Sequence, residues 1–547
     1  MPQSNTVMVK VQSLSGFDKS FYHDLTTNVG TLTPALFDEL IPNSTVNLNV
    51  AASVQLPPLA SDAFAKIDLK LEAFAIPHRL LYGGFEKWFS DDTVKMYDYN
   101  QTQTVEGQVS TLPHITIGSN WDELPQVFSR GSLTDYLGCK IAGDVFNGAV
   151  INILPFLAYG KVYDDWYRAP LVQNQLFSDG AILDAESNMG ALFGVANLPL
   201  ISQYDVNFLY AYDDDNYWQE YCDGTSLFSL RQRNYGFDYF TNAWPSLQFG
   251  SPMAIAPGPS GTMTISAIRA ANSMQQFKER NLFSKRYNEA VKSRYGANLS
   301  SAVVQRSVFL GSATIPIKTY GVDVTAGNDP SQTSVTQSNP FAISAGAQLG
   351  RARGEGFVNL IDNYHTDEPC YIMVLASIVP RAVYSSGTSR IFDRYVRAGG
   401  ITDMAAPLLQ NTGNQPIFSW ELTGNFGEFN RNYAFGYTDR YADWMTCPDR
   451  VSGQLREGGS LESFVLKRDF EDAGFVNVGS NFLQIPTTAL DEISATEQAI
   501  SNYGAWMQFG FDYKCVQPLA LYSLPSLQDP AYEHGHSVEL HRGGFRF

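Results

Sequence analysis

Apolar and polar residues alternate position by position in several short stretches of this chain. The clearest stretch is 66–75, where Ile67, Leu69 and Leu71 alternate with charged residues. Alternation with a period of two gathers the apolar side chains on one face of a β-strand. Residues 45–50 follow the same pattern. Strands with one apolar and one polar face are typical of an antiparallel sheet that is solvated on one side.

Further strands are predicted elsewhere along the chain. Residues 370–379 form an apolar run between two prolines, and this run is too short to span a bilayer, so we expect a buried strand. Alternation also occurs at 7–11 and at 509–524. Residues 17–34 have no regular pattern, and we expect them to be irregular.

One long segment, 264–295, carries a helical pattern instead. Its apolar residues recur mostly at spacings of three, four and seven, which places them on one stripe of an α-helix. They are Ile265, Ile268, Ala271, Phe277, Phe283, Tyr287, Ala290 and Val291. Gly296 follows the last turn and is a typical helix stop. Shorter helices are expected within 121–138 and 490–500.

The polar face of this predicted helix is basic. Segment 264–295 has seven basic residues against two acidic ones, whereas the whole chain has a net charge of −18. The basic positions of interest are Lys278, Arg280, Lys285, Arg286, Lys292 and Arg294. Such a face either contacts nucleic acid or is the solvated side of an ordinary packed helix, and the pattern alone favours the second interpretation.

Composition points to a surface that other molecules cover. Charged residues make up only 17% of the 547 positions, while the chain has 29 Tyr and 35 Phe. Aromatic side chains suit surfaces that are partly solvated and partly buried against a partner. Few charges on so long a chain indicate that neighbouring molecules bury much of its outside. We therefore expect an obligate assembly.

The chain lacks the motifs that carry most enzyme chemistry. Its five cysteines are scattered, the closest pair being Cys447 and Cys515, which excludes a CxxC motif and argues against a disulfide scaffold. The Gly-rich stretch 354–357 lacks the third glycine of a dinucleotide-binding loop. The acidic run 213–215 lacks calcium-loop spacing, and the His-x-His at 534–536 lies in a polar tail. We expect no catalytic site, no metal site and no cofactor.

Together these patterns predict a mainly β protein with short strands, long polar loops and one long helix. A sandwich or jelly roll with insertions fits this order better than alternating strands and helices. We expect a single domain over 1–547. The expected insertion loops are 91–111, 179–229, 320–350 and 472–502, and the expected flexible tail is 534–547.

Residues 437–456, YTDRYADWMTCPDRVSGQLR, resemble a block of the major capsid protein of the Microviridae, small icosahedral bacteriophages with single-stranded DNA. Other blocks resemble the same family in the same order: 17–42, 74–89, 132–138, 154–168, 238–245, 264–281, 305–311 and 371–387. The gokushovirus branch of this family has a long insertion before the helix, where this chain has only 251–263. The branch is therefore left open.

The resemblance implies a single eight-stranded antiparallel viral jelly roll with long insertion loops. It implies a major capsid protein that self-assembles into a T=1 icosahedral shell, encloses a circular single-stranded DNA genome and presents the host-facing surface of the virion. Assembly in the host bacterial cytoplasm is implied as well. The implied partners are other copies, the genome, a small basic DNA-binding protein, a DNA pilot protein and a host receptor, without membrane insertion. The residues alone also allow an all-β carbohydrate-binding or carbohydrate-active protein.

Residues 437–456 combine aromatic and arginine side chains in a stretch without period, which is typical of interface hot spots. The subunit-interface candidates are Tyr437, Arg440, Tyr441, Trp444 and Arg450. An internally packed loop is an equally good interpretation.

Contact with the genome needs local patches, because a chain of charge −18 cannot neutralise DNA by its bulk charge. The candidates for DNA contact lie in the tail: Arg542, Phe545, Arg546 and Phe547. Within a shell, the basic face of 264–295 would meet acidic neighbours, so we expect ion pairing there rather than DNA binding.

Overall fold

The computed structural model describes the chain in segments. They are 14–60, 63–82, 85–90, 112, 114–116, 130–139, 150–173, 204–205, 229–246, 291–292, 295–296, 306–323, 348–393, 414–425, 433–456, 458–470, 476–495 and 504–519. The candidate residues Lys278, Arg280, Lys285, Arg286 and Arg294, and the whole tail with Arg542, Phe545, Arg546 and Phe547, lie outside these segments.

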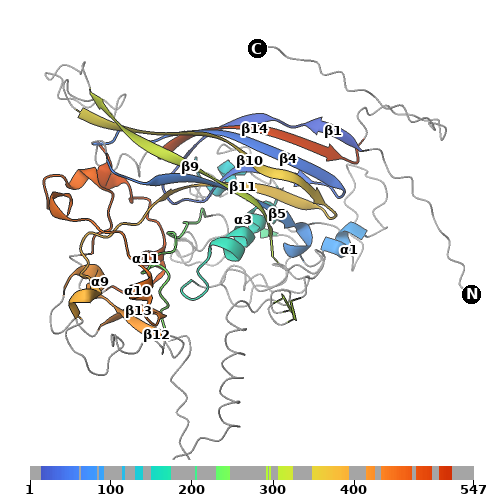
Figure 1. Ribbon diagram of the computed structural model, residues 1–547. Helices are drawn as coiled ribbons and strands as arrows, with labels where there is room; N and C mark the ends of the chain where they lie inside the picture. Colours follow the sequence, from blue (N-terminus) through green and yellow to red (C-terminus); the bar gives the residue numbers. More distant parts are fainter. Residues whose placement is uncertain are drawn as a thin grey trace, which may run out of the picture.

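The described chain is mainly β and is dominated by one curled antiparallel sheet (Figure 1). Its strands are β1 (Ser15–Asp18), β2 (Phe21–Thr27), β3 (Thr33–Leu40), β4 (Ser44–Gln55), β5 (Ile67–Pro77), β9 (Val308–Asp323), β10 (Gln348–Thr366), β11 (Cys370–Pro380) and β14 (Ala505–Gln517). The order across the sheet is β1-β14-β4-β10-β9-β5-β11-β3, and β2 also pairs with β14. Neighbouring strands are thus far apart in sequence.

Alternating burial explains why these segments are strands. Along β4 and β14 every second residue is buried, and the two strands pair in register, with Val50 opposite Phe511 and Leu48 opposite Tyr513. β11 is buried along its whole length, because Ile372, Val374 and Ala376 face the main core and the alternate residues pack in the cluster that contains α3. The strand predictions at 45–50, 66–75 and 370–379 are confirmed, and the prediction at 509–524 is confirmed as far as Gln517.

The expectation of irregular chain at 17–34 is wrong. β1 and β2 lie in that stretch, and both pair with β14. Tyr22 and Thr26 point outward from β2, whereas Leu25 and Thr27 are buried. The polar residues of this segment interrupt the alternation of apolar positions that predicts a strand. Main-chain pairing with β14, rather than a continuous apolar face, makes the segment a strand.

Helices cover one face of the β11 end of the sheet. α3 (Leu154–Val162) continues into a π-helical turn, η4 (Tyr163–Tyr167), and lies beneath β5 and β11 in Figure 1. The Tyr159 hydroxyl, fully buried, donates to the Leu32 carbonyl at 2.8 Å. The shorter elements on this side are η1 (His78–Leu80), α1 (Phe85–Ser90), α2 (Leu133–Tyr136), β6 (His114–Thr116), β7 (Val150–Asn152) and β8 (Tyr204–Asp205). α2 confirms the helix expected within 121–138.

A small lobe packs beside the sheet, drawn in orange in Figure 1. Its elements are η6 (Arg390–Asp393), β12 (Asn414–Phe418), α9 (Trp420–Thr423), β13 (Ala434–Asp439), α10 (Ala442–Met445), η8 (Gly453–Leu455), η9 (Glu462–Phe464) and α11 (Ser480–Leu483). The 3-10 turn η10 (Asp491–Ile493) follows and packs in the main core. Phe240, Ile417, Leu422, Phe435 and Phe482 belong to its separate apolar core. This lobe carries the interface candidates.

Several expected loops have different bounds in the structure. β9 runs to Asp323 and β10 begins at Gln348, so both ends of the expected loop 320–350 are strand. Within 472–502, Ile485, Leu490 and Ile493 are fully buried in the main core. The helix expected at 490–500 is only the 3-10 turn η10 in its described part.

Only the end of the long helix expected at 264–295 is described. Val291, Lys292 and Tyr295 are helical, and Lys292 is exposed. The Gly296 N–H donates to the Lys292 carbonyl at 2.9 Å, and Gly296 has a φ of +69°. A left-handed glycine that closes the last turn is a typical helix C-terminus. Loop 91–111 and nearly all of 179–229 lie outside the described residues.

Candidate subunit interface

The chain makes a strained turn at Tyr441, between β13 and α10. Tyr441 has a φ of +68°, in the left-handed region that residues other than glycine rarely adopt. Its N–H donates to Gln415 Oε1 at 2.7 Å, and its ring is 4% exposed. The hydrogen bond and the burial hold this conformation. The turn therefore fixes where α10 begins within the lobe.

An aromatic stack stands on this turn. The rings of Tyr441 and Trp444 are 4.9 Å apart and inclined by 12°, and the Arg440 guanidinium carbon lies 5.2 Å from the centre of the Tyr441 ring. Trp444 is 39% exposed and its neighbour Met445 is 55% exposed. A buried ring thus supports an exposed one. Tryptophan and arginine held in this way are typical of the residues that dominate binding energy at protein interfaces.

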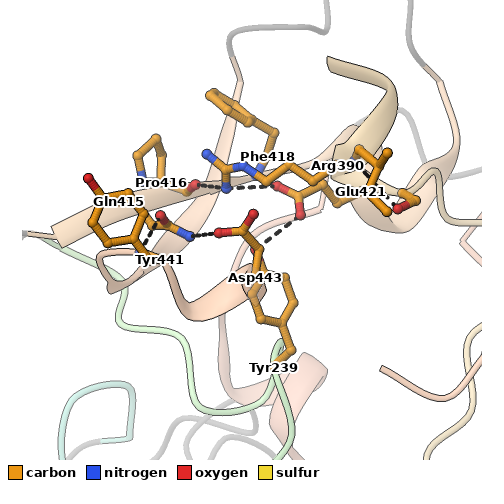
Figure 2. Close-up of polar contacts among 10 residues, drawn as sticks. Tyr239, Arg390, Gln415, Pro416, Phe418, Glu421, Tyr441 and Asp443 are labelled. Carbon is orange, nitrogen blue, oxygen red and sulfur yellow. Dashed lines mark hydrogen bonds and ion pairs between the residues drawn. The ribbon is translucent and has the colours of Figure 1, made fainter. Parts of the chain in front are cut away.

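A buried ion pair, Arg390 with Glu421, lies in the same lobe as Tyr441 (Figure 2). Arg390 Nη1 donates to the Pro416 carbonyl at 2.8 Å and lies 3.4 Å from Glu421 Oε1. Glu421 Oε1 also accepts the Phe418 N–H at 2.9 Å, and Oε2 accepts the Tyr239 hydroxyl at 3.1 Å. Arg390 and Glu421 are each almost fully buried, so these bonds offset part of the cost of desolvating two charges.

Burial dominates the electrostatics of this network. Desolvation raises the pKa of Glu421, and the nearby Arg390 charge only partly opposes that rise. Desolvation, followed by the charge of Glu421, raises the pKa of Tyr239, so this phenol stays protonated and acts as a donor. A second link, from Gln415 Nε2 to Asp443 Oδ1 at 2.9 Å, ties β12 to α10. β12, α9 and α10 are therefore held as one rigid unit.

The five interface candidates do not form one cluster. Arg440, Tyr441 and Trp444 lie together in the stack. Tyr437 lies earlier on β13 and is half-buried, and its main chain pairs with Trp244 through hydrogen bonds of 2.7 and 2.8 Å. Arg450 is exposed at a separate groove of about 300 Å³ that Phe64, Lys66, Arg381 and Val465 also line.

Sequence reasoning missed the residues that support the stack. Arg390 and Glu421 are 31 positions apart, and Gln415 and Tyr441 are 26 apart. No local period or motif connects residues at such separations, so no pattern in the sequence pointed to them. Within the described segments, no group of three or more His, Cys, Asp or Glu side chains could hold a metal ion. No helix of the described chain is long and apolar enough to cross a membrane.

An antiparallel β body with an exposed aromatic stack fits the class of structural proteins that assemble through their surfaces. A family model described as "Capsid protein (F protein)" matches residues 7–258 and 256–527, which is most of the chain. The chain therefore belongs to this capsid protein family. The resemblance to the major capsid protein of the Microviridae is confirmed, and the protein is a capsid protein of the virion.

Three curated relatives are similar along almost their whole length, and all are named capsid protein VP1. That of Chlamydia phage 1 is 22% identical, covering 94% of this chain and 96% of the relative. That of Bdellovibrio phage phiMH2K is 24% identical, covering 94% and 95%. That of Spiroplasma virus 4 is 22% identical, covering 92% and 93%. Full-length similarity at this identity fits a shared fold with diverged surfaces.

Proposed function

We propose that this capsid protein self-assembles into a closed T=1 icosahedral shell around a circular single-stranded DNA genome and presents the host-facing surface. The observation that carries the proposal is the number of large apolar side chains that the described part of the chain leaves exposed. Phe237 is 91% exposed, Phe392 73%, Ile391 65% and Met445 55%. Ile391 and Phe392 are consecutive on η6, and large apolar side chains exposed together mark surfaces that a second protein covers.

The order of strand pairing supports an eight-stranded jelly roll as the building block. β1 with β2, β14, β4 and β10 form one series, and β3, β11, β5 and β9 form the other. Each series thus alternates strands from the first 77 residues with strands that begin at Val308 or later, which is the arrangement that two Greek keys produce. A wedge of this kind has free loops at its ends, and these loops can contact neighbours around several symmetry axes.

The Arg440–Tyr441–Trp444 stack is proposed as one of the contacts between subunits. It combines residue types that carry interface energy with a rigid support, which limits the entropy lost on binding. A small basic DNA-binding protein, a DNA pilot protein and a host receptor are further proposed partners, in keeping with the Microviridae membership.

Electron microscopy of the expressed chain tests the assembly proposal. Negatively stained preparations should contain uniform closed shells that sediment as one large species. Particles no larger than a monomer or dimer under every assembly condition would contradict the proposal. Turnover or binding on a glycan panel would instead support a carbohydrate-directed β-sandwich.

A further inference from the structure

A row of polar and aromatic side chains crosses four strands on the outer face of the sheet. Lys318 on β9 is opposite Arg353 on β10, Arg353 is opposite Gln55 on β4, and Gln55 is opposite Trp506 on β14. Directly opposed residues point to the same face of a sheet. Their chain neighbours Ile317, Ala352, Val54 and Met507 are all buried, so the row faces outward.

A second opposed pair, Arg351 and Tyr320, extends this row by two residues along the β9–β10 ribbon. We call the six residues the cross-strand row: Lys318, Tyr320, Arg351, Arg353, Gln55 and Trp506. Arg353 is 55% exposed, Tyr320 51% and Trp506 37%. In Figure 1, β14, β4 and β10 lie side by side in the upper sheet and β9 continues it.

The three cations of the row, Lys318, Arg351 and Arg353, lie close together although their charges repel one another. Lys318 stands directly opposite Arg353, and like charges in opposed positions destabilise a sheet. Of the three cations only Arg353 has an ion pair within the described chain, with Glu355. The patch thus carries three basic residues and one acidic residue, whereas the whole chain has a charge of −18. An anion bound here would relieve the repulsion.

The glycines of β10 have a packing role that explains the Gly-rich stretch 354–357. Gly354 and Gly356 face inward, where an added Cβ would lie 3.0 Å from the Pro316 carbonyl oxygen and 2.9 Å from Ile315. Because these inward positions are glycine, β10 lies close to residues 315–316 of β9. These glycines therefore are not a phosphate loop, and the residues between and beside them, Arg353, Glu355 and Phe357, point outward from the sheet.

We propose that the cross-strand row binds single-stranded DNA. Lys318, Arg351 and Arg353 contact phosphates, and bases stack on Trp506 and Tyr320. Gln55, between the cations and Trp506, offers both a donor and an acceptor to a base edge. From Lys318 to Trp506 the row spans three strand spacings, about 14 Å. Cations beside stacking rings, without base-specific geometry, are typical of sites that bind single strands of any sequence.

This inference rests on the proposed enclosure of a genome, and it places the face of β14, β4 and β10 toward the inside of the shell. A neighbouring subunit with an acidic surface is the other occupant that the charge of the row would suit. The exposed rings on the row favour a nucleic acid, because bases stack on the flat faces of aromatic rings and carboxylate side chains do not. The two occupants give opposite results in the experiment below.

Binding is measured with subunits released from purified particles and a fluorescent oligothymidylate, at salt concentrations from about 50 to about 200 mM. The variant Lys318→Gln/Arg351→Gln/Arg353→Gln should bind more weakly, with the slope of log K against log salt reduced by about 2, since each phosphate contact contributes about 0.7. The control Lys66→Gln/Arg130→Gln/Arg381→Gln removes the same charge from exposed positions away from this face of the sheet, and Arg381, like Arg353, has one carboxylate partner. It should leave the slope unchanged, and equal losses in both variants would show diffuse binding and overturn the proposal.

The stacking residues have their own test. Trp506→Ala should weaken binding roughly 5- to 150-fold, as loss of one base stack does. Phe89→Ala removes a ring that is 61% exposed elsewhere and should not change the affinity. Unchanged affinity in Trp506→Ala and in Tyr320→Ala would contradict base stacking on the row.

If a variant fails to fold, the proposal is tested on assembled wild-type particles instead. Ultraviolet cross-linking of the packaged DNA, followed by mass spectrometry, should recover peptides that contain Tyr320 or Trp506. Cross-links only in other peptides would overturn the proposal. So would a Lys318, Arg351 and Arg353 variant that folds but forms no shells while the wild type does, because the row would then be a subunit contact. Absence of shells from the wild type would instead contradict the assembly proposal alone.

Discussion

Tyr441 lies beneath Trp444, with ring centres 4.9 Å apart, and the buried ring fixes the orientation of the exposed one. Substitutions in this pair can distinguish an effect on the stability of the subunit from an effect on assembly, because Tyr441 is buried and Trp444 is exposed. Removing the exposed ring changes the surface of the lobe, whereas removing the buried ring changes its core.

Trp444→Ala is expected to prevent shell formation while leaving a folded subunit. Loss of a hot-spot tryptophan weakens one contact by about 2 kcal/mol or more, and a closed shell repeats that loss at every subunit. The measurement is the assembled fraction by sedimentation, together with the melting temperature of the subunit. Tyr433→Ala is the matched control, because Tyr433 is 38% exposed in the same lobe. Normal shell yield from Trp444→Ala would remove the stack from the interface.

Arg390→Ala is expected to destabilise the lobe strongly. It leaves the buried Glu421 carboxylate without its charged partner, and breaking a buried pair costs about 3–5 kcal/mol. Urea unfolding of Arg390→Ala, Glu421→Ala and the double variant measures the coupling. The double variant should lose less than the sum of the two single losses. Additive losses would mean that the two charges do not stabilise each other.

Glu72 is expected to make stability fall in acid. Burial raises its pKa, but the two hydrogen bonds from Arg233, at 2.6 and 3.0 Å, and the bond from the Tyr167 hydroxyl outweigh burial, so the pKa is lowered overall. A lowered pKa means that the unfolded chain binds the proton more tightly. This stability is complete above the unfolded value, about 4.3, and is lost as the pH falls through the folded value.

The variant Glu72→Gln tests that sign. Its urea midpoint should lie below that of the wild type at neutral pH, and the difference should shrink below about pH 4 as the wild-type carboxylate becomes protonated. Asp362→Asn is a suitable control, because Asp362 lies on β10 and its side chain is exposed. A difference that grows on acidification would contradict the assignment.

Gly387→Ala is expected to disturb the lobe at the support of the stack. An added Cβ would lie 2.1 Å from the Glu421 carbonyl oxygen, which is main chain and cannot rotate away. Forcing such an atom into a packed site costs about 1–3 kcal/mol or more. Thermal unfolding measures the loss. Gly479→Ala in the same lobe meets no atom closer than 4.0 Å and should be close to neutral, so equal losses would point to a general effect of losing glycine.

Local pattern predicted those strands in which burial alternates. Residues 45–50, 66–75 and 370–379 were found because each strand has apolar positions on the face that the sheet buries. β2 was missed because His23, Asp24 and Thr26 interrupt the apolar pattern of a strand that main-chain pairing holds in place. The end of the helix at Gly296 was found because a left-handed glycine is a local requirement.

By itself, the sequence determined the class of fold and the family, since these depend on periods and blocks within short stretches. Only the tertiary structure decided that Tyr441 is buried and Trp444 exposed, since a hydrogen bond from Gln415 and a left-handed turn set their directions. It also decided that Lys318, Arg353, Gln55 and Trp506 form one row. Strand register joins residues that lie hundreds of positions apart, and no local period encodes such pairing.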